Sequence, residues 1–138
     1  MTHHIHKHSH QHNRNFLIKY LISVAKADNN FTDSEKQHIF KQGATLGMTE
    51  QEIEKIMTNP SSVEFHPPAN KEERFENFFA IVKIMLQDGE IHAKERRICT
   101  SYAIMIGYPS AKIDNILDKI ISGIHKGLSK DEISEELF

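Results

Sequence analysis

The sequence predicts an all-α protein, a single domain of about seven helices built from two internally duplicated helix–acidic loop–helix units. Three observations lead to this prediction. Residues 28–36 align without a gap with residues 88–96, sixty positions later, and the aspartate and glutamate are kept. Apolar residues recur at the three- and four-residue spacing of amphipathic helices, and no segment shows the period-two alternation of a strand. Capping signals and glycines divide the chain into helical lengths.

The duplication preserves acidic, apolar and glycine positions together. Each half has an aspartate followed seven residues later by a glutamate, then an aliphatic–glycine step. The shared pairs are Asp28/Asp88, Phe31/Ile91, Glu35/Glu95, Leu46/Ile106, Gly47/Gly107, Ile53/Ile113 and Ile56/Ile116. We therefore expect each half to bend at its own acidic corner.

Composition excludes several classes of function. The 138 residues carry a formal net charge of -2, and no basic stripe with interleaved aromatics indicates nucleic-acid binding. No long apolar run indicates a membrane span, and the N-terminus lacks the apolar region of a signal peptide. The single cysteine, Cys99, fits a reducing compartment, so the cytoplasm is the expected location. Because Cys99 aligns with Ile39, it is interpreted as a small buried hydrophobe, with a reactive thiol as the alternative.

Residues 1–13 are expected to form a flexible histidine-rich tail, and residues 14–138 the helical domain. The first repeat, about residues 15–58, opens with a helix that ends near residues 28–30, because Asn tolerates the left-handed conformation at a helix end. The apolar stripe expected on this helix consists of Phe16, Tyr20, Leu21, Val24 and Ala25.

Two capping boxes predict the next two helices. Thr32 with Glu35 begins a helix that runs to about residue 46, where Gly47 ends it. Thr49 with Glu52 begins another that runs to about residue 58. Prolines then bracket a loop at residues 59–68.

The second repeat, about residues 70–122, follows the same plan. Asn70 is a good N-cap with Glu73 three residues on, and it begins the helix with the longest apolar stripe, which ends at residues 88–89. The next helix is predicted over residues 93–106.

The last two helices are predicted from a proline and a capping box. Pro109 suits the first turn of a helix that ends near Gly123. Ser129 with Glu132 begins a C-terminal helix over about residues 129–137.

Four carboxylates at the corners are the candidate binding residues: Asp28, Glu35, Asp88 and Glu95. Carboxylate oxygens suit hard cations such as Ca²⁺, Mg²⁺ and Mn²⁺, so two corners predict two sites or one shared site. The alternative is structural: negative charge stabilises a helix N-terminus, and aspartates accept backbone N–H bonds in turns. Both interpretations stay open.

The corners do not match an EF-hand, which needs Gly at position 6 and Glu at position 12 of its loop. Counted from Asp28, these positions hold Asp33 and Ile39. Counted from Asp88, they hold Ala93 and Cys99, so both loops fail.

Residues 27–35 with the Leu46–Thr49 step, and residues 88–95 with the Ile106–Gly107 step, resemble the signature of the TerB-like domains. This family includes the tellurite-resistance TerB proteins and the N-terminal domain of DjlA co-chaperones. The resemblance covers about residues 15–122 and rests on an A-D-G-x-I-x-x-x-E corner followed by a Leu-Gly step. Asn29 replaces the usual Gly of the first corner, and Gln87 replaces the usual Ala of the second.

The resemblance implies an internally duplicated all-helical domain without a settled activity, linked to metal or tellurite stress response. It also implies an acidic cluster that binds divalent metal. By position, that role falls on the four corner carboxylates.

The N-terminal histidines form a second candidate site of different chemistry. Neutral imidazole suits Zn²⁺, Ni²⁺ and Cu²⁺. Three interpretations stay open for the tail: a purification device, a native metal store or sensor, and a disordered appendage. Its histidines are His3, His4, His6, His8, His10 and His12.

Three function hypotheses follow. The first is a non-enzymatic TerB-like module that binds divalent cations at its corners. The second is a protein–protein interaction scaffold whose acidic residues only cap helices and whose apolar groove binds a partner helix. The third, a hydrolase using clustered carboxylates, requires a carboxylate with a strongly perturbed pKa in a cleft.

Overall fold

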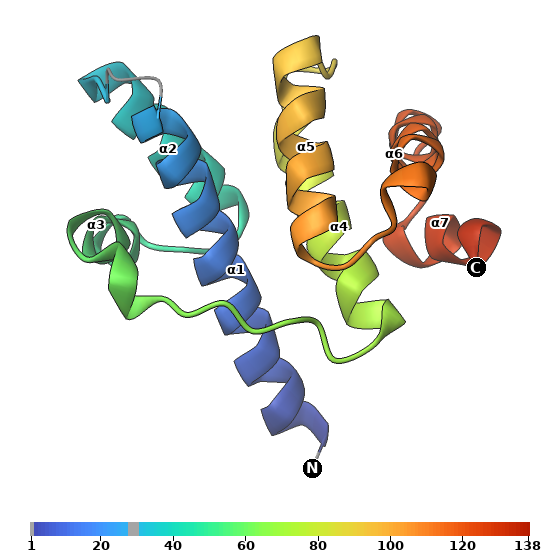
Figure 1. Cartoon of the computed structure of the whole chain (residues 1–138), viewed down its shortest axis with the longest axis horizontal. Helices are drawn as coiled ribbons and strands as arrows, with labels where there is room; N and C mark the ends of the chain where they lie inside the picture. The colour runs from blue at the N-terminus through green and yellow to red at the C-terminus, as the bar shows by residue number, and fades with distance from the viewer. Residues whose placement is uncertain (1, 28–30) are drawn as a thin grey trace. The chain divides into compact units, whose positions relative to one another are not determined.

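The structure is a computed structural model of the whole chain (Figure 1). It describes residues 2–27 and 31–138, with side chains described from residue 12 onward. Within these residues the fold is all-α, with seven α-helices and no strand, as the sequence predicts. None of the helices described is both long and apolar enough to cross a membrane.

The chain divides into two compact units, Met1–His66 and Pro67–Phe138, where one domain was expected from the sequence. The division falls in the proline-containing loop between the two predicted repeats.

The first unit contains three α-helices and one short 3₁₀ helix. They are α1 (Thr2–Ala27), α2 (Asp33–Thr45), α3 (Glu50–Thr58) and η1 (Pro60–Ser62). The helices α1, α2 and α3 contact one another pairwise, and η1 follows α3 (Figure 1). Their shared core consists of Leu17, Ile18, Leu21, Ile22, Ile39, Met48, Ile53 and Ile56.

Helix α1 corrects two expectations. It begins at Thr2 rather than near residue 15, so the backbone of the histidine-rich segment is helical rather than a separate flexible tail. The histidine-rich residues 1–13 contain neither glycine nor proline, the two residues that most strongly disfavour a helix. The buried face is also turned from the expected stripe, because Phe16 and Tyr20 are only half-buried whereas Leu17 and Ile18 are fully buried.

The second unit contains four α-helices: α4 (Lys71–Met85), α5 (Ala93–Met105), α6 (Ser110–His125) and α7 (Lys130–Leu137). Helix α4 contacts the other three. It ends at Met85 rather than at residues 88–89, because Leu86 caps it and the Leu86 carbonyl accepts the Gly89 N–H at 2.8 Å. Its buried residues are Phe75, Asn77, Phe78, Ile81, Val82, Ile84 and Met85.

The two units share their element spacing. Helices α2 and α5 begin and end sixty positions apart, and α3 and α6 begin sixty positions apart. Gly47 and Gly107 both adopt positive φ, at 79° and 110°, a backbone region that glycine occupies at little cost. The internal duplication itself stays a prediction.

Candidate functional site

The acidic corner of the second unit lies between α4 and α5. Asp88 and Glu90 are exposed on either side of Gly89, whose φ of 95° turns the chain. The Gly89 carbonyl lies 3.1 Å from Nε2 of His125, so the end of α6 contacts this corner. Glu95, in the first turn of α5, is half-buried.

The carboxylate of Glu95 accepts a hydrogen bond from the backbone at the start of its own helix. Its Oε1 accepts the N–H of His92 at 3.1 Å, and His92 is the N-cap residue of α5 with extended backbone. This bond satisfies one of the N–H groups that a helix N-terminus leaves without an intrahelical partner.

The first corner is described only in part. Asp28 lies outside the described residues. Thr32 is the N-cap of α2, and its Oγ1 accepts the backbone N–H of Glu35 at 3.2 Å. Of the four predicted corner carboxylates, the structure therefore places Glu35 in the first corner and Asp88 and Glu95 in the second.

Among the described residues, no group of three or more His, Cys, Asp or Glu side chains is placed to hold a metal ion. The side chains of His3, His4, His6, His8 and His10 lie outside the described part. His12 is described, and its ring centroid lies 4.9 Å from that of His66.

Two further glutamates show the same capping geometry away from the corners. At α3, Glu52 Oε1 accepts the Thr49 N–H at 3.0 Å, and Thr49 Oγ1 accepts the Glu52 N–H at 3.1 Å. At α7, Glu132 Oε1 accepts the Ser129 N–H at 3.0 Å, and the reciprocal bond is 3.1 Å. Both capping boxes were predicted from the sequence and are confirmed.

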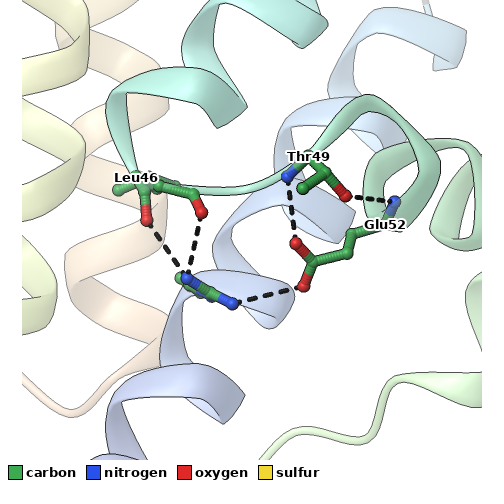
Figure 2. A network of polar contacts seen from close by, with 5 residues as sticks. Leu46, Thr49 and Glu52 are labelled. Atoms are coloured by element: carbon green, nitrogen blue, oxygen red, sulfur yellow. Dashed lines mark hydrogen bonds and ion pairs between the residues drawn. The ribbon is translucent and has the colours of Figure 1, made fainter.

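An arginine network missed by sequence reasoning joins the helices of the first unit (Figure 2). Nη1 of Arg14 lies 3.5 Å from the Leu46 carbonyl and 3.4 Å from the Gly47 carbonyl, beyond the end of α2. Nη2 of the same guanidinium lies 3.2 Å from Oε2 of Glu52. The backbone bond from Thr49, followed by smaller contributions that include the Arg14 charge, lowers the pKa of Glu52 below 4.5.

The second unit has an arginine at the corresponding position with a different partner. Arg74 lies sixty residues after Arg14, and its guanidinium is 5.6 Å from the ring centroid of Tyr108. A Cβ added to Gly107 would lie 3.4 Å from Nε of Arg74, so this arginine also covers the glycine turn. Extending the sixty-residue alignment upstream to Arg14 and Arg74 would have revealed this pair.

The most strongly shifted side chains of the second unit are buried. Burial, and then the charge of Glu95, raise the pKa of the Cys99 thiol to about 12. Burial raises the pKa of Tyr108 to about 12. A raised thiol pKa opposes formation of the reactive thiolate, which agrees with Cys99 as a fully buried hydrophobe.

Comparison of the chain with protein-family models, curated proteins and solved structures gives no match.

Proposed function

We propose that this chain is a non-enzymatic helical module of the TerB-like type that acts by binding another protein, and that its corner glutamate Glu95 serves as a helix cap. The bond between Glu95 and the His92 N–H carries the capping part of this proposal. The same bond forms at Glu52 and Glu132, which lie outside the acidic corners. A glutamate three residues after the N-cap is therefore a recurring device of this chain, and a corner needs no cation to explain it.

The shifted pKa values do not match those of a nucleophile or a general acid. A nucleophile is activated when its pKa falls, whereas burial raises the pKa of both Cys99 and Tyr108. Backbone hydrogen bonds within the caps lower the pKa values of Glu52 and Glu132. A general acid at neutral pH requires the opposite shift.

Two neighbouring apolar side chains at the end of α5 support a protein partner. Ile104 is 52% exposed and Met105 is 42% exposed, and both lie in the last turn of the helix. Burying an exposed aliphatic side chain against a partner contributes about 1.5–3 kcal/mol. The apolar face of a partner helix is the chemistry that fits this pair.

The partner proposal is tested by photo-crosslinking from position 101, an exposed site one turn before Ile104. The crosslinked protein is identified, purified and titrated against the full chain. The double variant Ile104→Glu/Met105→Glu should weaken its binding at least tenfold, whereas the exposed control Phe138→Glu should leave binding unchanged. Equal binding by the double variant and the wild type would show that Ile104 and Met105 do not contribute to partner binding.

Divalent cation binding at the corners is the second candidate, favoured by the repeated Asp28…Glu35 and Asp88…Glu95 spacing. Calorimetry of the full chain with Ca²⁺, Mg²⁺ and Mn²⁺ tests it. Heat of binding that disappears in the Asp28→Ala/Asp88→Ala variant would support the cation hypothesis. An identical trace from both proteins would eliminate it.

A further inference from the structure

The loop after η1 crosses α1 and makes several specific contacts with it. Figure 1 shows this segment, in green, crossing α1, and three contacts hold it there. Nζ of Lys19 donates to the Val63 carbonyl at 2.7 Å, and the ring centroids of Phe16 and Phe65 are 4.7 Å apart. The third contact is the pair His12 and His66, with centroids 4.9 Å apart and planes at 63°.

These contacts follow one another along both segments. The α1 partners step back from residue 19 to 16 to 12, about one turn at a time, while the loop advances from 63 to 65 to 66. The contacts therefore follow opposite chain directions in the two segments. The hydrogen bond and the phenylalanine pair position His66 next to His12 before Pro67 restricts the following backbone.

We propose that His12 and His66 together bind a transition-metal ion of the Zn²⁺, Ni²⁺ or Cu²⁺ class. Two imidazoles on a tetrahedral ion, with metal–nitrogen distances of about 2.0–2.1 Å, hold their ring centroids about 5 Å apart. The observed separation of 4.9 Å matches this geometry. Imidazole is a preferred ligand of these ions.

Water molecules would complete the coordination of an ion held by the pair. The site adds His66 to the histidines of the N-terminal segment, and it does not depend on the proposed protein partner or on the acidic corners.

A metal held by this pair has a thermodynamic signature that a tail chelator lacks. The N-terminal histidines are close in sequence, and metal that bound them equally in the folded and unfolded chain would leave the unfolding temperature unchanged. His12 and His66 are 54 residues apart and meet only in the folded first unit. An ion that bridges them at 100 times its Kd shifts the unfolding equilibrium about 100-fold toward the folded state.

The test is thermal unfolding of the full chain with and without zinc chloride, followed by circular dichroism. The wild type should gain about 10 °C in Tm at saturating Zn²⁺. His66→Gln and His12→Gln should lose this gain while keeping the metal-free Tm. His38→Gln, which removes an exposed histidine of α2 in the same unit, should retain the full gain.

A calorimetric titration with Zn²⁺ gives a second readout. In a full-length variant with glutamine at His3, His4, His6, His8 and His10, the remaining site should weaken at least tenfold when His66→Gln is added. The proposal is overturned if Zn²⁺ leaves the wild-type Tm unchanged, or if His66→Gln gains as much as the wild type. Either result would show that Zn²⁺ does not bridge His12 and His66.

Discussion

The guanidinium of Arg14 lies 3.2 Å from the carboxylate of Glu52 and joins α1 to the N-terminus of α3. In the second unit the position corresponding to Glu52 holds Lys112, which offers no carboxylate. Arg74 instead lies over the ring of Tyr108, which stands where the first unit has Met48. Both arginines lie at a glycine turn. Arg14 makes an ion pair there, whereas Arg74 makes a cation–π contact.

Arg14→Met tests the network of the first unit. The substitution keeps much of the aliphatic stem and removes the bonds to Leu46, Gly47 and Glu52. Because the Arg14 side chain is only 18% exposed, we expect a loss of about 1–2 kcal/mol in the free energy of unfolding. Urea denaturation measures it. A loss below about 0.3 kcal/mol would show that the network adds no more than an exposed ion pair.

Glu52 should contribute a pH-dependent part of the stability. Its pKa is lowered in the folded chain, so the stabilisation is present above pH 4.5 and is lost as pH falls through the lowered pKa. The carboxylate is 43% exposed, so solvent limits the effect to less than about 1 kcal/mol. Glu52→Gln should show a shallower loss of stability below pH 4.5 than the control Glu54→Gln, an exposed residue of the same helix. Parallel acid unfolding curves would contradict this.

Tyr108 offers separate tests of its ring and its hydroxyl. The buried hydroxyl has no hydrogen-bond partner among the described residues, so Tyr108→Phe should be neutral or stabilising. Tyr108→Leu removes the ring under Arg74 and should cost about 2 kcal/mol. Because the folded pKa is raised from 10.0 to about 12, stability should fall as pH rises above 10, and Tyr108→Phe should lack that part of the decline. Denaturation at pH 8 and pH 11 compares the three proteins.

Cys99 should behave as core rather than as a reactive thiol. It is fully buried, so a thiol reagent should label the native chain only as fast as the chain opens. Cys99→Ser places a hydroxyl in this apolar site and should cost about 1–3 kcal/mol. The raised pKa also predicts that stability falls as pH rises above 9.0. Rapid stoichiometric labelling of the folded chain at pH 8 would contradict this assignment.

Local chemistry predicted most helix boundaries. Thr49, Asn70 and Ser129 were identified as N-caps from their own hydroxyl or amide and from the residues that follow, and each accepts the expected N–H. Gly47 and Gly107 were predicted to end helices, and both adopt positive φ. These features depend on residues within one turn of each other, so the sequence carries them directly.

Long-range contacts explain why the positions of two side chains of α1 could not be predicted from the sequence. Phe16 was expected in the core stripe of α1, but its ring contacts Phe65, which lies in a loop 49 residues later. Arg14 was overlooked because its partners, the carbonyls of Leu46 and Gly47, are 32 and 33 residues away. Neither contact leaves a local sequence signal. Glu95 was ambiguous because a cap and a cation ligand require the same residue at the same position.

The unfolding free energies of wild type, Glu95→Gln and Glu95→Ala, each with and without millimolar Ca²⁺, Mg²⁺ or Mn²⁺, test most directly whether the corner glutamate Glu95 is a cap. A glutamine oxygen can still accept the His92 N–H, so Glu95→Gln should stay within about 0.5 kcal/mol of wild type, while Glu95→Ala loses about 1 kcal/mol. The ions should change none of these values. If an ion stabilises the wild type and Glu95→Gln abolishes that gain, the corner is a cation site and the capping account is wrong.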